Sequence, residues 1–141
     1  DAAYGVQSVS MEELLKESDY VVAAVPLTDQ TFHLFNEERI AQMKAGSVLI
    51  NIARGPVVDE EALAQALASG HLGGCAVDVF PKEPCTNSVL TRYANALLTP
   101  HSATSTAENS KATNFAAANN LVNYLKKDID AKYVVVQGTR Y

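Results

Sequence analysis

Four short apolar runs divide the chain, and the segments between them carry apolar residues at helical spacing. The runs consist mainly of Val, Leu, Ile and Ala and cover residues 20–25, 47–52, 74–80 and 96–99. The first run is closed by Pro26 and is typical of a strand that is covered on both faces. We therefore predict four short strands in this order.

Short polar residues mark the starts of the predicted helices. Ser10 is followed three residues later by a glutamate, which is the pattern of a capping box. Asn36 and Asp59 are also suited to accept hydrogen bonds from the first turn of a helix. The pattern predicts helices over residues 10–18, 36–43 and 59–69, the last two followed by glycines that favour a helix end.

A longer helix is predicted after residue 101, beyond a polar stretch rich in Thr and Asn. Its apolar positions recur at helical spacing and predict an inward face made of Phe115, Ala118, Val122 and Leu125. Residues 133–136 are again apolar, and two interpretations remain open for them. They form either a last short strand or a tail that docks elsewhere.

Strands separated by helical segments favour parallel pairing with right-handed crossovers, and hence an α/β fold with helices flanking a parallel sheet. The chain has 141 residues, of which 48% are hydrophobic and 19% charged. This is enough to bury one core, so we predict a single domain.

Charge and cysteine content narrow the function classes. A net charge of −5 and a pI near 5.1 argue against binding nucleic acid or an anionic membrane through a basic surface. No apolar run approaches the roughly 20 residues that a membrane helix needs. Cys75 and Cys85 fit free thiols in a reducing compartment, which predicts a cytoplasmic protein, and no metal-ligand spacing is present.

Four titratable or charged residues lie at or beyond the ends of the predicted strands: Arg54, Asp78, Glu83 and His101. Because loops at the carboxyl ends of parallel strands converge on one crevice, these residues can meet despite their separation in sequence. Simpler interpretations remain open: a loop histidine, a solvated glutamate and a surface arginine. Asp78 would be costly to bury unpaired, but it could merely cap a backbone group.

Ordered motifs along most of the chain carry a resemblance to a known family. They are Val25-Pro26-Leu27-Thr28, Met43-Lys44-Ala45-Gly46, Leu49-Ile50-Asn51, Ala53-Arg54-Gly55, Val58-Asp59-Glu60-Glu61-Ala62-Leu63, Asp78-Val79-Phe80, Glu83-Pro84 and Thr99-Pro100-His101. In these motifs and their separations the chain resembles the D-isomer-specific 2-hydroxyacid dehydrogenases. No Gly-x-Gly-x-x-Gly occurs, and Gly5 alone precedes Gly46. The chain therefore looks like the C-terminal portion of a partial Rossmann-type NAD-binding domain over residues 1–141, without the glycine loop and the substrate domain.

The resemblance implies a role for three of the four residues in catalysis. His101 resembles the general acid-base, and an imidazole suits this role because it gains and loses a proton near neutral pH. Glu83 resembles the carboxylate that pairs with that histidine and orients it. Arg54 resembles the residue that binds the substrate carboxylate, for which a guanidinium offers a matching fork of donors.

The resemblance also implies an NAD cofactor, with NAD preferred over NADP only by analogy with the family. Asp78 resembles the acceptor that holds the nicotinamide carboxamide. The backbone of Val25, Ile52 and Ala53 looks like the wall beside the nicotinamide ribose, with Arg54 and His101 also next to the cofactor. Thr104 stands where the family often has Gly, so it could reshape the cofactor side of the loop.

The implied function is an NAD-dependent oxidoreductase that interconverts a D-2-hydroxy acid and its 2-keto acid, in a protein expected to be a homodimer. Formate is disfavoured because formate dehydrogenases of the superfamily have Gln where Glu83 stands. An alternative is a non-catalytic NAD(H)-binding module similar to the family's co-repressors. The isolated chain is expected to be inactive, and its strand at residues 20–25 could lie at an uncovered sheet edge.

Overall fold

The protein consists of two compact units, and the computed structural model describes its residues 4–133. The first unit spans residues 1–103 and is called the sheet unit here. The second spans residues 104–141 and is called the helical unit. Each is described by itself below.

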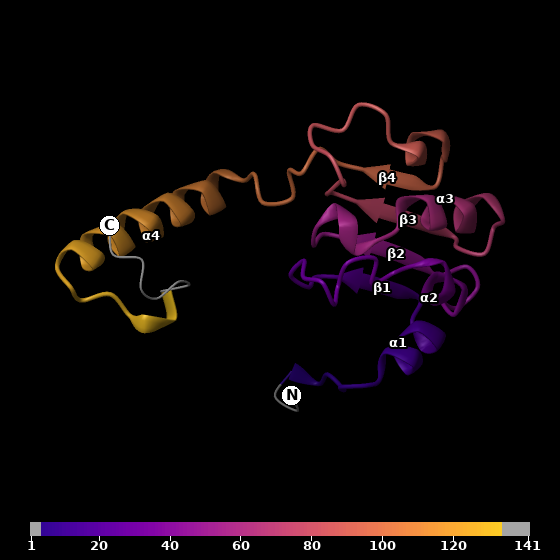
Figure 1. Ribbon diagram of the computed structural model, residues 1–141, viewed down its shortest axis with the longest axis horizontal. Helices are drawn as coiled ribbons and strands as arrows, with labels where there is room; N and C mark the ends of the chain where they lie inside the picture. Colours follow the sequence, from indigo (N-terminus) through magenta and orange to yellow (C-terminus); the bar gives the residue numbers. More distant parts are fainter. Residues whose placement is uncertain (1–3, 134–141) are drawn as a thin grey trace. The chain divides into compact units, whose positions relative to one another are not determined.

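The sheet unit is built on four parallel strands in the order β1-β2-β3-β4 (Figure 1). They are β1 (Tyr20–Ala23), β2 (Val48–Asn51), β3 (Gly74–Val77) and β4 (Ala96–Leu98). The predicted α/β fold and all four strands are confirmed. Each strand ends before its apolar run does, and the remaining residues enter the loops at the carboxyl edge of the sheet.

The predicted helix starts are confirmed. Helices α1 (Met11–Glu17), α2 (Glu37–Ala41) and α3 (Glu60–Ala68) begin after Ser10, Asn36 and Asp59, whose side chains accept backbone N–H groups of the first turn. The second helix ends two residues earlier than predicted. Just beyond this helix, the N–H of Lys44 donates to the carbonyl oxygen of Leu15 in α1 instead of continuing the helix.

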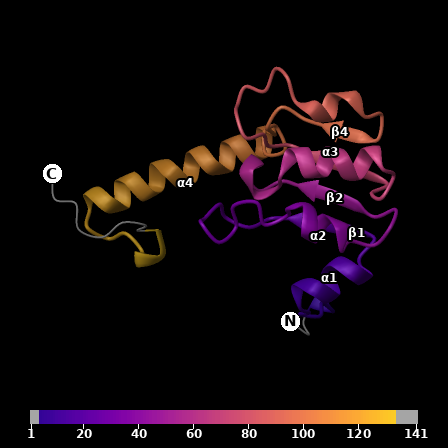
Figure 2. The same cartoon turned by 45° about the vertical axis from the view of Figure 1, so that its right-hand side comes forward.

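One face of the sheet carries the core. Buried residues alternate along β1, where Val21 and Ala23 are buried but Tyr20 and Val22 are 69% and 51% exposed. The helices α2 and α3, which contact each other, pack on the buried side (Figure 2). The prediction that this strand is covered on both faces is therefore wrong. The apolar run arises because the second face is also apolar, although no described residue of the sheet unit covers it.

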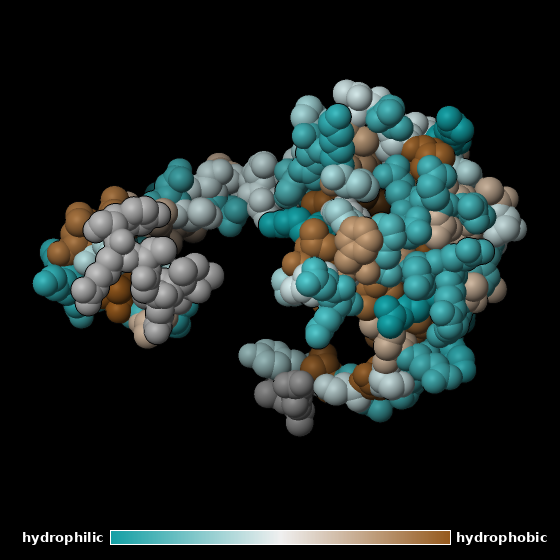
Figure 3. Space-filling model, in the orientation of Figure 1, coloured by the Kyte–Doolittle hydropathy of each residue, from teal (hydrophilic) through white to brown (hydrophobic). Residues whose placement is uncertain are grey.

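The helical unit contains the long predicted helix, α4 (Ala107–Leu125), which Thr106 caps. None of its residues is buried, and hydrophobic residues are visible at the surface of this unit (Figure 3). The predicted inward face is exposed: Phe115 by 69%, Val122 by 45% and Leu125 by 71%, with Ala118 exposed as well. The spacing therefore predicted the helix correctly, but within the helical unit the described residues 104–133 leave its apolar face uncovered.

Short 3-10 helices complete the two units, at Gly55–Val57, Val89–Arg92 and Ala131–Tyr133. The first lies in the loop after β2 and the second in the connection between β3 and β4, and neither was predicted. Of the apolar segment 133–136, all but Tyr133 lies outside the described residues. No helix within residues 4–133 is both long and apolar enough to cross a membrane.

Candidate active site

The loop that follows β2 presents Arg54, and a buried asparagine shapes this loop. Asn51 ends the strand and is 1% exposed. Its Oδ1 accepts the N–H of Ala53 at 3.1 Å, and its Nδ2 donates to the carbonyl oxygen of Arg54 at 3.1 Å. The Arg54 side chain is exposed, and its Nη1 donates to the carbonyl oxygen of Ala53 at 2.7 Å. The guanidinium thus lies at the surface, on a loop whose backbone is held by the buried Asn51 side chain.

Gly55 brings the Arg54 loop against the loop that follows β3. A Cβ atom at residue 55 would overlap the backbone of Phe80 and Pro81, so only glycine allows this approach. The contact places Arg54 beside the segment that carries Glu83. The charge of Arg54 is accordingly among the smaller causes that lower the pKa of Glu83.

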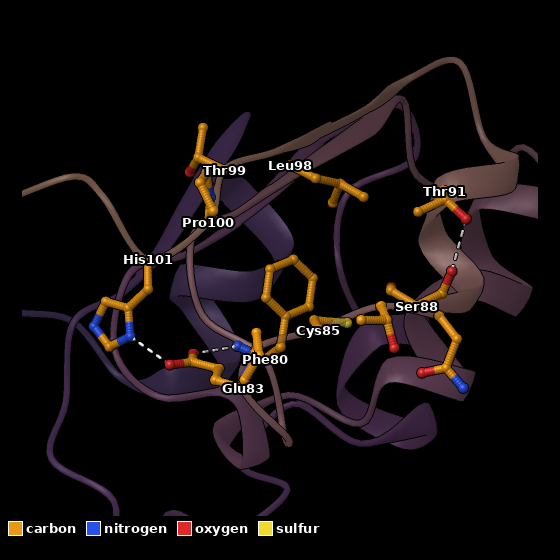
Figure 4. A pocket seen from close by; sticks show the side chains of 12 residues that line it. Phe80, Glu83, Cys85, Ser88, Thr91, Leu98, Thr99, Pro100 and His101 are labelled. Carbon is orange, nitrogen blue, oxygen red and sulfur yellow. Dashed lines mark hydrogen bonds and ion pairs between the residues drawn. The ribbon is translucent and has the colours of Figure 1, made fainter.

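Glu83 and His101 form a direct pair (Figure 4). Oε2 of Glu83 lies 2.7 Å from Nδ1 of His101, and Oε1 accepts the N–H of Phe80 at 2.9 Å. The hydrogen bond with His101, followed by that from Phe80, lowers the pKa of Glu83 below its ordinary value. Because Nδ1 is engaged by the carboxylate, Nε2 is the ring nitrogen left for a ligand.

The backbone of His101 is in the left-handed region, with φ at 51°. This conformation is uncommon for residues other than glycine and costs on the order of 1–2 kcal/mol. Thr99 lies two residues before His101. Its N–H donates to the carbonyl oxygen of Val77 at 3.0 Å and so extends the pairing of β3 with β4 by one residue. The sheet thus fixes the chain just before the strained residue.

Asp78 directly follows β3 and is 7% exposed. Its Oδ1 accepts the Thr99 hydroxyl at 2.6 Å and Ser102 N–H at 2.8 Å, and its Oδ2 accepts Ala103 N–H at 3.1 Å. Burial opposes ionisation, but these hydrogen bonds outweigh it and lower the pKa of Asp78. The interpretation that Asp78 caps backbone groups is confirmed, while a contact with a nicotinamide stays a prediction.

Several hollows lie along this edge of the sheet unit. A groove of about 460 Å³ is lined by residues 24–27 and 52–54, which include Val25, Ile52 and Ala53. A cleft of about 340 Å³ brings together Arg54, Glu83 and His101. A largely apolar pocket of about 320 Å³ lies on the far side of Phe80, next to Cys85 and Leu98 (Figure 4).

The structure thus gathers most of the predicted site residues in the sheet unit. Arg54, Glu83 and His101 share one cleft, and Val25, Ile52 and Ala53 line the adjoining groove. Asp78 borders neither hollow, because its carboxylate is directed to the loop of residues 99–103. Thr104 belongs to the helical unit, where its carbonyl oxygen accepts Asn109 Nδ2 at 2.8 Å.

Two further site residues were missed in the sequence. Asn51 shapes the Arg54 loop and Thr99 binds Asp78. The signal for Asn51 was available, because a polar residue inside an apolar run must find a partner when it is buried. Thr99 offered no such signal, since threonine is common in strands.

The remaining histidines and cysteines lie outside the cleft that holds Arg54, Glu83 and His101. His33 and His71 are partly exposed, and Nε2 of His71 is 3.1 Å from the carbonyl oxygen of Ile40. Both cysteines are free thiols, as predicted, and burial raises the pKa of Cys75 to about 11. No group of three or more His, Cys, Asp or Glu residues suited to a metal ion occurs within residues 4–133.

Comparison with known proteins identifies the family. The sequence profile of the D-isomer specific 2-hydroxyacid dehydrogenase, NAD binding domain, matches residues 1–103, the whole sheet unit. This chain belongs to that family. The predicted resemblance is therefore confirmed.

Individual relatives agree with this assignment. A glyoxylate reductase of Pyrococcus furiosus is 44% identical over 125 residues, which cover 89% of this chain and 37% of that protein. The D-lactate dehydrogenase of Aquifex aeolicus, solved with NAD and lactic acid, matches with a TM-score of 0.76 and 36% identity over 85% of this chain and 41% of that one. An NAD-dependent formate dehydrogenase of Staphylococcus aureus gives 0.83 and 32%, over 92% and 40%. The chain thus spans about two fifths of the length of each of these proteins.

Proposed function

We propose that the protein containing this chain is an NAD-dependent oxidoreductase that interconverts a D-2-hydroxy acid and its 2-keto acid. The observation that carries the proposal is the Glu83–His101 pair, 2.7 Å apart, in the same cleft as Arg54. A carboxylate, an imidazole and a guanidinium together can bind a 2-keto acid and move one proton. Membership of the dehydrogenase family supports the same reaction.

His101 is the proposed general acid-base. In the reducing direction Nε2 donates a proton to the carbonyl oxygen of the substrate, and in the oxidising direction it removes that proton from the hydroxyl group. Glu83 holds the ring through Nδ1 and favours the protonated form of the imidazole by its negative charge. When bound, NAD supplies or accepts the hydride.

Arg54 is the proposed anchor for the substrate carboxylate. Its guanidinium is exposed at the cleft, and one of its nitrogens, Nη1, is engaged by the backbone of Ala53. The remaining donors suit a two-oxygen contact with a carboxylate. Because Gly55 packs against Phe80, this contact would hold the substrate next to His101.

The groove beside the cleft fits the nicotinamide and ribose end of NAD. It is formed by small and aliphatic residues, and Ile52 is 50% exposed there. Such a surface suits a flat ring with one apolar face. We assign Val25, Ile52 and Ala53 to this wall, with Arg54, His101 and Asp78 at the nicotinamide. The cofactor contact predicted for Thr104 stays a prediction.

We further propose that residues 1–141 are the C-terminal portion of an NAD-binding domain. The strand β1 lies at the edge of the sheet with Tyr20 and Val22 exposed, which suits pairing with a strand from outside this chain. A phosphate-binding glycine loop, absent from this sequence, would then come from the same outside segment. The isolated chain should consequently show no turnover. A homodimer and a cytoplasmic location remain predictions.

Small 2-keto acids are the proposed substrates, with glyoxylate first. A relative named glyoxylate reductase, from Pyrococcus horikoshii, shares 55% identity with this chain over 91 residues. Glu83 continues to disfavour formate, because oxidation of formate to CO₂ transfers only a hydride and leaves no proton for a His–Glu pair to move. The similarity to a formate dehydrogenase therefore supports the fold rather than that substrate.

The test is turnover by the full-length protein with NADH and a panel of 2-keto acids. We expect turnover with glyoxylate or another small 2-keto acid and a fall in kcat of about 10²–10⁴-fold in His101→Asn. His33→Asn is the matched control and should keep wild-type kcat. NADH binding without turnover by the wild-type protein would instead support a non-catalytic module, and wild-type turnover by His101→Asn would refute the proposed acid-base.

A further inference from the structure

The three residues that donate hydrogen bonds to Asp78 lie on either side of His101 in the sequence. Thr99 lies two residues before the histidine, and Ser102 and Ala103 lie one and two residues after it. All three donors end on one carboxylate. The loop of residues 99–103 is therefore closed around a single acceptor group, with His101 at its turn.

The carboxylate is itself fixed to the sheet. Asp78 is 7% exposed, and its N–H donates to the carbonyl oxygen of Asn51 at 3.1 Å, so the residue is tied to the end of β2. A loop that is hydrogen-bonded to a carboxylate fixed in this way is held in its conformation. This matters at His101, whose φ of 51° persists only if the surrounding contacts enforce it.

Two carboxylates thus hold His101 in different ways. Glu83 contacts the imidazole ring, whereas Asp78 accepts hydrogen bonds from the Thr99 hydroxyl before the histidine and from the backbone N–H groups of Ser102 and Ala103 after it. We propose that Asp78 is a positioning residue that, together with the Thr99 hydroxyl, holds the loop of residues 99–103 in the strained turn that directs His101 to Glu83 and the cleft. This inference rests on the proposed function and deepens it.

The chemistry of the carboxylate suits this task. An ionised carboxylate accepts about four hydrogen bonds and donates none, and three positions are filled here. The hydrogen bonds lower the pKa of Asp78 despite its burial, so the charged acceptor is the form present near neutral pH. An asparagine would have a single acceptor oxygen and would set its NH₂ group against one of the donors.

The positioning role differs from a contact with the nicotinamide carboxamide, and the two can coexist because one acceptor position remains free. A carboxamide contact alone makes Asp78 important for NADH affinity and leaves Thr99 without influence. The positioning role makes both residues important for kcat. Thr99 is therefore the more discriminating site to change.

The test compares Thr99→Val, Thr99→Ser and Asp78→Asn in the full-length protein. Valine removes only the hydroxyl, and serine restores it. We expect kcat to fall about tenfold in Thr99→Val and about a hundredfold in Asp78→Asn, with an altered pH profile of kcat/KM, because small displacements of a catalytic group have effects of this size. Thr99→Ser should behave as wild type, and the dissociation constant of NADH from Thr99→Val should be unchanged.

Amide hydrogen exchange gives a readout that is independent of turnover. The N–H groups of Ser102 and Ala103 should be protected in the wild type and in Thr99→Ser, and should exchange at least about tenfold faster in the other two variants. Wild-type kcat, pH profile and amide protection in Thr99→Val would overturn the proposal. If His101→Asn retained full turnover, the proposed function would fail, and the exchange rates would still decide whether Asp78 and Thr99 hold this loop.

Discussion

The sheet unit and the helical unit obtain their order from different sources. The sheet unit buries a continuous cluster that includes Leu15, Leu49 and Leu63, each at most 1% exposed. In the helical unit α4 buries none of its residues, so its helix depends on local hydrogen bonds and on the cap at Thr106. Burial therefore orders the unit that carries the candidate site, whereas the described part of the helical unit shows a helix held by its own hydrogen bonds and its cap.

The largest expected difference is in the response to loss of apolar volume. Leu63→Ala, in the core of the sheet unit, should lower the free energy of unfolding by about 2–5 kcal/mol, because it removes buried contacts and leaves a cavity. The matched change Leu121→Ala, at a residue 60% exposed in α4, should change it by less than about 0.5 kcal/mol. Urea denaturation followed by circular dichroism measures both. Equal effects would show that α4 is packed in solution.

A smaller difference is expected for the two helix caps. Asp59 accepts N–H groups of Glu61 and Ala62 at the start of α3, and Thr106 accepts Asn109 N–H at the start of α4. Asp59→Ala should reduce the free energy of unfolding of the sheet unit by about 1 kcal/mol. Thr106→Ala should instead reduce helical content without shifting that transition. A shift by Thr106→Ala as large as that by Asp59→Ala would mean that the units unfold together.

The smallest expected effect is the acid sensitivity of the sheet unit. The folded-state pKa of Glu83 lies below its ordinary value near 4.5, so its contribution to stability is present above about pH 4.5 and is lost as the pH falls through the folded-state value. Asp78 acts in the same sense from about pH 3.8 downward. Urea midpoints measured between pH 3 and 7 should therefore fall at the acid end, and less steeply in Glu83→Gln. An equal decline in wild type and Glu83→Gln would contradict the stabilising role of this carboxylate.

The sequence predicted those features that depend on neighbouring residues. The caps at Ser10, Asn36 and Asp59 were correct, because a side chain three residues before its partner N–H needs no tertiary information. The strands were also found, but each was predicted too long, since a ladder ends where its neighbouring strand ends. The apolar run of β1 suggested cover on both faces, because apolar residues do not reveal whether a covering segment is present, whereas the position of β1 at an uncovered sheet edge was expected from the resemblance.

The candidate site was likewise predicted only in part from the sequence. Strand-end positions placed Arg54, Glu83 and His101 in one crevice, and the cleft confirms that they meet. The hydrogen-bond partners of Asp78 could not be predicted from the sequence. Its three donors are separated from it by 21 to 25 residues and come together only after the sheet has formed. Side-chain direction at a strand end is a tertiary property.

The central claim is that Arg54 and His101 hold the two ends of a 2-keto acid. A crystal structure of the full-length protein with NAD and oxamate, an unreactive analogue of such acids, tests it most directly. We predict that the oxamate carboxylate lies within hydrogen-bond distance of the Arg54 guanidinium and that its carbonyl oxygen lies within hydrogen-bond distance of His101 Nε2, with Nδ1 still bound to Glu83. Oxamate bound away from Arg54, or with its carbonyl oxygen directed to another donor, would contradict the account.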